Sequence, residues 1–213
     1  MTKQWMEFWI SDKNLDDRNK LNSVFEYLPE YVGRSILYQI NSRKTDIIAE
    51  FGCGNGALLS FIEGNSESGR TVGIDFCSEH VNNNLSKNSM LLLNDVFNVE
   101  LKTESVDRSF CNTLFNYLNI DECVATFEEM YRITKKGGFI LCANIIKKEF
   151  TDVFNLKLKD IKTPSINMDL NSKILENIAN STVSDQSKCI VYDNELLGYE
   201  NNGTTMNMLV WKL

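Results

Sequence analysis

Apolar and polar positions along this chain alternate in blocks that predict strands and helices in turn. Short apolar runs closed by glycine or polar residues indicate buried strands, and apolar residues recurring every three to four positions indicate helices. The predicted strands are residues 46–51, 70–75, 90–93, 109–112 and 139–144. The predicted helices between them are residues 57–62, 78–85 and 122–134. Such alternation is typical of a parallel sheet with helices on both faces.

The two ends of the chain follow other patterns. Residues 1–45 show helical spacing of apolar residues, which predicts a helical segment before the first strand. Near the carboxyl end we expect a helix at residues 168–179 and two strands at residues 189–192 and 206–211. Two strands joined by a short connection pair antiparallel. We therefore expect an α/β fold with a seven-stranded, mostly parallel sheet that ends in an antiparallel hairpin.

Composition narrows the class of protein. The 213 residues suit one domain, and 43% hydrophobic with 24% charged residues is an ordinary globular balance. The net charge of −7 disfavours nucleic acid as a partner, because phosphate backbones bind basic surfaces. No apolar run reaches the roughly 18–20 residues of a membrane span, and the first ten residues lack the features of a secretory signal. We expect a cytoplasmic protein without a membrane span.

Six cysteines are scattered along the chain. None forms a C-x-x-C pair, and no histidine stands at metal-ligand spacing beside them. The sequence therefore predicts reduced, mostly buried thiols and no metal site. They are Cys53, Cys77, Cys111, Cys123, Cys142 and Cys189.

A glycine-rich loop joins the first predicted strand to its helix. Gly52, Gly54 and Gly56 allow backbone torsions and close approaches that side chains block, so a ligand can lie against the loop and the helix amino terminus. A dinucleotide site is one interpretation, since Asp75 stands at about the distance of the expected ribose acid. Glu50 counts against it, because a second carboxylate suits a cationic ligand better than a pyrophosphate. A plain tight turn is the remaining alternative.

Several further motifs follow the glycine loop in a fixed order. The loop motifs span residues 50–56, 73–75, 94–96 and 105–112. Residues 129–138 form a helix-to-strand segment with Lys136 where a proline is usual. In this order the motifs resemble those of the class I S-adenosylmethionine-dependent methyltransferases. The resemblance implies a Rossmann-like fold, S-adenosylmethionine as cofactor with S-adenosylhomocysteine as product, and methyl transfer to an oxygen or nitrogen of a small-molecule acceptor.

The resemblance also implies a cofactor site at the strand ends. Asp75 would accept hydrogen bonds from the ribose hydroxyls, and Asp95 would accept from the adenine amine unless it caps a helix. Asn112 would take the methionine amino group or line the methyl-transfer face, with a turn residue as the alternative. The full expected set is Glu50, Gly52, Cys53, Gly54, Gly56, Asp75, Phe76, Asn94, Asp95, Val96 and Asn112.

Methyl transfer depends mainly on alignment, because the sulfonium is already activated. Tyr117 lies just past the fourth strand and is expected near the methyl group, as a pocket wall or hydrogen-bond donor rather than a base. His80 is more consistent with a surface helix residue than with a base.

We expect one domain with a cap at residues 1–45, a cofactor core at 46–145 and an acceptor-side segment at 146–213. A catalytically silent cofactor-binding module remains the alternative.

Overall fold

The computed structural model describes residues 42–65, 70–146, 166–170 and 205–213, together with a few helical positions before residue 41. Those positions are Gly33, Ile36, Leu37 and Ile40, and they agree with the helical segment expected before the first strand. Most of that segment and the predicted strand at residues 189–192 lie outside the described residues. The cap, the acceptor-side segment and the terminal hairpin therefore stay predictions.

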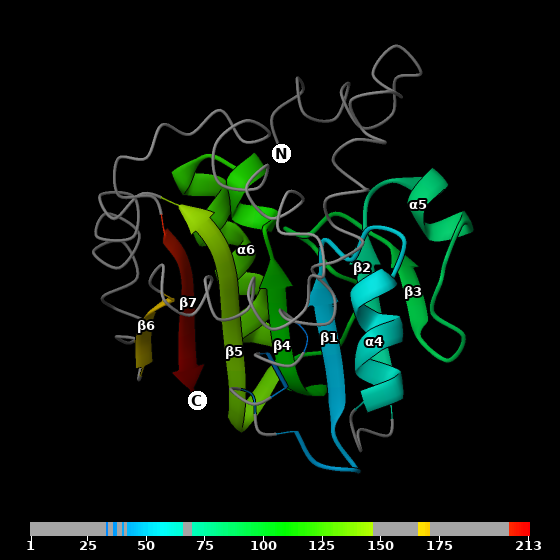
Figure 1. The fold of residues 1–213 in the computed structure, drawn as a ribbon, viewed down its shortest axis with the longest axis horizontal. Coiled ribbons are helices and arrows are strands. Elements are labelled where there is room, and N and C mark those ends of the chain that lie inside the picture. Colours follow the sequence, from blue (N-terminus) through cyan, green and yellow to red (C-terminus); the bar gives the residue numbers. More distant parts are fainter. Residues whose placement is uncertain are drawn as a thin grey trace, which may run out of the picture.

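Strands and helices alternate through the described core, as Figure 1 shows. The strands are β1 (Ile47–Phe51), β2 (Arg70–Asp75), β3 (Met90–Leu93), β4 (Val106–Asn112), β5 (Thr134–Ile146), β6 (Ile166–Leu170) and β7 (Thr205–Lys212). The helices are α4 (Ala57–Asn65), α5 (Ser78–Asn82), the 3-10 helix η2 (Leu114–Tyr117) and α6 (Ile120–Ile133).

These strands form one sheet in the order β3-β2-β1-β4-β5-β7-β6. Strands β1 to β5 pair in parallel, which confirms the predicted parallel sheet. Strand β7 runs antiparallel to both β5 and β6. Figure 1 shows α4 in front of the sheet and α6 behind it, and the carboxyl ends of the parallel strands lie at the top of that view. The strand order reverses between β1 and β4, which is where ligands bind in open α/β sheets.

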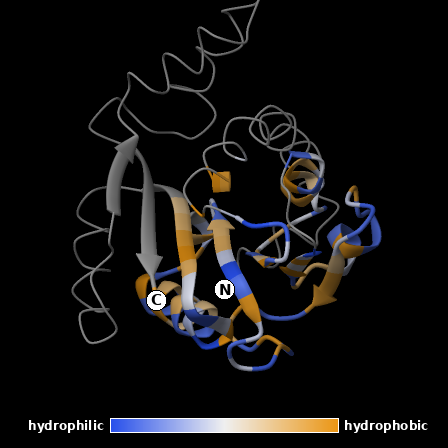
Figure 2. Cartoon of the chain, turned by 90° about the horizontal axis from the view of Figure 1, so that it is seen from below, coloured by the Kyte–Doolittle hydropathy of each residue, from blue (hydrophilic) through white to orange (hydrophobic). Residues whose placement is uncertain are grey.

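Each face of the sheet has its own apolar core. On the α6 face, Phe51, Cys111 and Phe127 belong to one fully buried cluster. On the α4 face, Ile48 and Leu59 belong to a second cluster that includes Ile36 and Ile40. Seen from below, the described strands and helices are orange over much of their length, whereas the loops between them are mainly blue (Figure 2). The apolar runs therefore serve as the two buried layers that the sequence pattern predicts.

Helix α6 begins two residues before the predicted start, because Asn119 caps it. The Asn119 side chain accepts from the Asp121 and Glu122 N–H groups, and Glu122 accepts from the Asn119 N–H. This reciprocal pair satisfies two backbone donors that the first turn would leave free.

Strand β5 begins earlier than predicted. It starts at Thr134 and not at residue 139, so Gly137 and Gly138 lie inside it, at an irregularity in its pairing with β4. Gly137 has a φ of 78°, and a Cβ on Gly138 would lie 2.6 Å from the Asp107 carbonyl oxygen, so both glycines serve the bulge. The first three residues of the helix expected at 168–179 lie in β6 instead, where pairing with β7 overrides the local pattern, and residues 171–179 lie outside the described residues.

Among the described residues, none of the helices is both long enough and apolar enough to cross a membrane.

Candidate functional site

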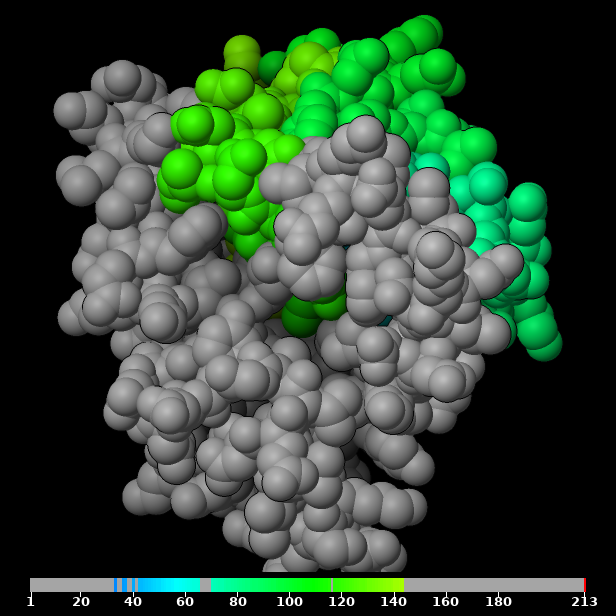
Figure 3. All heavy atoms as spheres, turned by 90° about the horizontal axis from the view of Figure 1, so that it is seen from above, coloured from blue at the N-terminus to red at the C-terminus, as the bar shows by residue number. Residues whose placement is uncertain are grey.

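The parallel strands bring their polar end residues to one edge of the sheet. Glu50 lies one residue before the end of β1, Asp75 ends β2 and Asn112 ends β4. Figure 3 looks onto this edge, and its visible described atoms come mainly from the green part of the chain, from β3 to α6. The sequence correctly predicts that these three side chains meet at one end of the sheet.

The glycine loop is fixed on the end of β2. The N–H groups of Gly52 and Cys53 donate to the Ile74 carbonyl oxygen, at 2.8 and 3.1 Å. Gly52, Gly54 and Gly56 have φ values of 71°, 54° and 73°, in the left-handed region that favours glycine. The loop is thus a defined backbone conformation and not merely a flexible connection.

Two of these glycines also define the space around the loop. A Cβ on Gly52 would lie 2.9 Å from Leu114 of η2, so the bare backbone lets the turn after β4 pack against the loop. A Cβ on Gly54 would meet no described residue within 4 Å, so among the described residues its backbone borders space that a ligand can fill. This open face beside Asp75 is the candidate ligand cradle.

Asp75 anchors the loop and faces the cradle. Its Oδ2 atom accepts from the Gly54 N–H at 2.8 Å, and its Oδ1 atom accepts from the Cys77 N–H at 2.9 Å. The Nδ1 atom of His80, on α5, lies 3.5 Å from Oδ1. Each carboxylate oxygen can accept more than one hydrogen bond, so the side chain can bind hydroxyl donors while it holds the loop. The half-buried Phe76 follows directly and leads into α5.

Glu50 is a buried carboxyl group. It is 3% exposed, and within the described residues its Oε2 atom has no hydrogen-bond partner. Burial raises its pKa well above the ordinary value, and repulsion from Asp75 adds to the shift. Burial raises the pKa of the neighbouring Cys53 thiol as well, so that cysteine is an inert neighbour and not a nucleophile.

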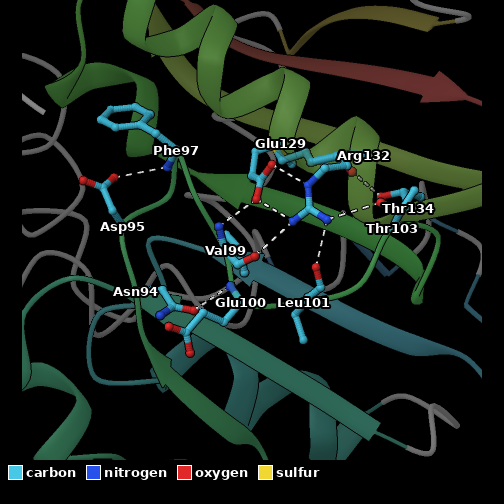
Figure 4. Close-up of polar contacts among 11 residues, drawn as sticks. Asn94, Asp95, Phe97, Val99, Glu100, Leu101, Thr103, Glu129, Arg132 and Thr134 are labelled. Carbon is cyan, nitrogen blue, oxygen red and sulfur yellow. Dashed lines mark hydrogen bonds and ion pairs between the residues drawn. The ribbon is translucent and has the colours of Figure 1, made fainter.

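The segment after β3 carries the third motif. The Asn94 N–H donates to the Asp75 carbonyl oxygen at 3.0 Å, which joins the ends of β2 and β3. Asp95 is exposed, and its Oδ1 atom accepts from the Phe97 N–H at 3.1 Å (Figure 4). No helix begins at Asp95, so the helix-cap alternative is wrong: the side chain stabilises a turn instead. Val96 is buried beneath that turn.

A salt bridge on α6 holds this segment in place (Figure 4). Arg132 donates to both carboxylate oxygens of Glu129, at 2.6 and 2.7 Å, and to the carbonyl oxygens of Val99 and Leu101. Glu129 in turn accepts from the Val99 N–H at 2.6 Å. The sequence motif contains both residues but does not indicate this role, because their partners lie about thirty positions away.

Glu129→Gln should destabilise the fold by roughly 1.5–3 kcal/mol at neutral pH, the scale of hydrogen bonds to a charged group. The hydrogen bonds from Arg132 lower the pKa of Glu129, so the native protein holds this carboxylate more strongly ionised than the unfolded chain does. Its stabilisation is present above the unfolded pKa and is lost as the pH falls through the folded one. Urea unfolding at neutral and acid pH should show the two proteins converging in acid; a constant difference would contradict this.

The turn after β4 contains the residues expected near the reacting methyl group. The Oδ1 atom of Asn112 is buried and, within the described residues, has no hydrogen-bond partner. Thr113 has a left-handed φ of 56°, and its N–H donates to the Ala143 carbonyl oxygen at 2.7 Å. Tyr117 is half-buried at the end of η2, on the turn whose Leu114 packs against the glycine loop. The strained Thr113 has no signal in the sequence, since only its conformation marks it.

The described cysteines are free and buried, and the described residues contain no group of three or more metal-ligating side chains.

Comparison with known proteins agrees with this architecture. Residues 49–142 match the family model described as a methyltransferase domain. The chain is 30% identical over 132 residues to phosphoethanolamine N-methyltransferase 1 of Triticum aestivum. It is 24% identical over 131 residues to demethylmenaquinone methyltransferase of Oceanobacillus iheyensis. Each alignment covers 58% of this chain, but only 24% and 55% of the relative.

Solved structures share the fold at low identity. The plantazolicin methyltransferase BpumL, solved in complex with SAH, superposes with a TM-score of 0.68 at 13% identity. The superposition covers 97% of this chain and 93% of BpumL.

Proposed function

We propose, from the premise that residues 49–142 of this chain belong to the methyltransferase domain family, that the protein transfers a methyl group from S-adenosylmethionine to a small-molecule acceptor. The observation that carries the proposal is the pairing of the buried Glu50 with Asp75 beside the open backbone of Gly54. Two carboxyl groups and a glycine loop suit a ligand that is positively charged and carries a ribose. They suit a dinucleotide poorly, because its pyrophosphate is an anion.

The residues present fit the cofactor part by part. Asp75 has acceptor capacity for the ribose hydroxyls at the end of β2. The exposed Asp95 offers a second oxygen to the adenine amine, above the buried Val96. The side-chain oxygen of Asn112, which has no hydrogen-bond partner among the described residues, suits the methionine ammonium group. When bound, the cofactor supplies a methyl group on a positively charged sulfur, and this sulfur is a good leaving group because it departs as a neutral thioether.

The chain's own contribution to catalysis is alignment. The glycine loop and the β4 turn touch through Gly52 and Leu114, so the two sides of the site hold each other in position. Tyr117, on that turn, would wall the methyl-transfer face or donate a hydrogen bond to the acceptor. Fixing the nucleophile in line with the methyl group accounts for much of the rate of such a displacement.

The names of the relatives bear on the acceptor. The wheat enzyme is named for phosphoethanolamine and for transfer to nitrogen, and the Oceanobacillus enzyme for demethylmenaquinone. Both names indicate small molecules, so we infer a small-molecule acceptor with an oxygen or nitrogen nucleophile. The cap at residues 1–45 and the segment at 146–165 are proposed to enclose it.

A catalytically silent module that only binds the cofactor is the second candidate. It would share Asp75 and the glycine loop, since those residues bind rather than react. Release of S-adenosylhomocysteine in the presence of candidate metabolites separates the two functions, because a silent module binds the cofactor without consuming it.

Titration calorimetry tests the proposed ligand class. The protein should bind S-adenosylmethionine and S-adenosylhomocysteine and should not bind NAD, because the Asp75 carboxylate repels a pyrophosphate and the buried carboxyl group of Glu50 offers it no positive charge. Adenosine serves as the control for binding through the ribose and adenine alone. Binding of NAD with neither sulfur nucleoside bound would reject the proposal.

A further inference from the structure

Glu50 lies in an apolar row across the centre of the sheet. In the register of the strands it is the neighbour of Gly73 on β2 and of Phe110 on β4, and Phe110 is the neighbour of Leu141 on β5. Residues in register on parallel strands point to the same face. Gly73 contributes no side chain, and Phe110 and Leu141 are fully buried. The carboxyl group of Glu50 is thus enclosed by apolar neighbours on its own face.

The ionisable groups around Glu50 disfavour a negative charge there. Asp75 at the end of β2 and Cys111 on β4 both raise its pKa by repulsion, in addition to the larger effect of burial. Cys53 in the glycine loop is a buried thiol, and His80 of α5 faces Asp75 at 3.5 Å from its Oδ1 atom. The Oε2 atom of Glu50 has no hydrogen-bond partner within the described residues. None of these described groups compensates for the cost of an ionised carboxylate.

We propose that Glu50 carries a proton in the free protein and releases it to solvent when a positively charged nucleoside binds at the glycine loop, so that the site selects ligands by charge. The inference rests on the proposed function. The O–H bond of the carboxyl group breaks, the proton passes to the buffer, and the carboxylate keeps the electron pair and faces the ligand cation. A sulfonium or ammonium supplies the countercharge that the surrounding groups lack, which favours the ionised form.

Three ligands of graded charge test the coupling. Beside one carboxylate each, S-adenosylmethionine carries a sulfonium and an ammonium, and S-adenosylhomocysteine carries the ammonium alone. 5′-Methylthioadenosine carries none of these groups, so the first two are the cationic ligands of the test. Calorimetric titrations in two buffers of different ionisation enthalpy count the protons released. At a pH where Glu50 is protonated, the two cationic ligands should release up to about one proton per site, and 5′-methylthioadenosine none.

Affinity should depend on pH in the same way. For the cationic ligands the association constant should rise by up to about tenfold per pH unit over the range in which free Glu50 is protonated. Glu50→Gln keeps the size and polarity of the neutral carboxyl, so it should still bind 5′-methylthioadenosine like the wild type. Its affinity for the cationic ligands should be weaker and lose this dependence. His80→Asn is the matched control, since His80 lies 3.5 Å from Asp75 at the same edge of the sheet; this variant should keep the proton release.

The free protein provides a second readout. A folded pKa raised above the unfolded value means that stability is complete below the unfolded pKa and falls as the pH rises through the folded one. The melting temperature of wild type relative to Glu50→Gln should therefore fall as pH increases.

The outcomes separate the inference from the proposed function. Binding of S-adenosylhomocysteine without proton release, release that persists in Glu50→Gln, or release that disappears in His80→Asn would each overturn the inference and leave the methyltransferase proposal intact. Failure of both sulfur nucleosides to bind would overturn both.

Discussion

Arg108→Met should cost about 3–5 kcal/mol of unfolding free energy, which is the largest effect on stability that we expect from a single substitution here. Arg108 lies in β4 at the end of the sheet opposite the glycine loop and is 5% exposed. Its Nη2 atom lies 3.2 Å from Asp46, its Nε atom donates to the Ile40 carbonyl oxygen at 2.8 Å, and its guanidinium lies 4.7 Å from the Phe139 ring centroid. Methionine keeps the apolar bulk but leaves Asp46 buried without its countercharge.

Urea unfolding of four proteins measures this interaction. Arg108→Met, Asp46→Asn and the double variant form a cycle with the wild type, and the double variant should be less destabilised than the sum of the single ones. Arg70→Met, at the exposed start of β2, is the matched control and should change stability by less than about 0.5 kcal/mol. Additive losses around the cycle would show that Arg108 acts through packing and not through Asp46.

The boundaries of some strands could be predicted from the sequence, and those of β4 could not. The strands at residues 70–75 and 90–93 were predictable to the residue, because apolar runs with polar ends are a local signal. Strand β4 begins at Val106, not at residue 109, because Asp107 and Arg108 look like loop residues. Their partners lie far away in the chain: Asp107 accepts from the Ile47 N–H, and Arg108 reaches Ile40. A polar residue with a remote partner can lie in a buried strand without any local sign of it.

The candidate site likewise has features that the sequence could predict and features that it could not. That Glu50, Asp75 and Asn112 share one edge follows from the parallel topology, so the sequence could predict it. The sequence could not predict that Glu50 Oε2 has no hydrogen-bond partner in the described part of the chain, since this depends on the register that places Gly73 and Phe110 beside it. The sequence also could not indicate that each carboxylate oxygen of Asp75 accepts a hydrogen bond from the backbone, Oδ2 from the Gly54 N–H and Oδ1 from the Cys77 N–H.

Asp75→Ala should weaken binding of S-adenosylhomocysteine by roughly 1.5–3 kcal/mol, or about ten- to 150-fold, the scale of hydrogen bonds to a charged group. The carboxylate has two tasks at one position. In the proposed function it would supply acceptors for the ribose hydroxyls, and in the structure it fixes the Gly54 and Cys77 N–H groups at 2.8 and 2.9 Å. Removing it would take away the proposed ligand contact and loosen the loop.

Asp75→Asn keeps part of both tasks. The amide oxygen can still accept from the Gly54 N–H, but the NH2 group cannot accept from the Cys77 N–H, and the loss of the charge weakens the proposed bonds from the ribose. Its affinity should therefore lie between those of wild type and Asp75→Ala. Glu128→Ala, an exposed acid on α6, controls for net charge and should bind as the wild type does. Calorimetry gives the affinities, and circular dichroism melts check that each variant is folded. Wild-type affinity in a folded Asp75→Ala protein would place the ribose contact elsewhere, and Asp95 would then be the acid to test next.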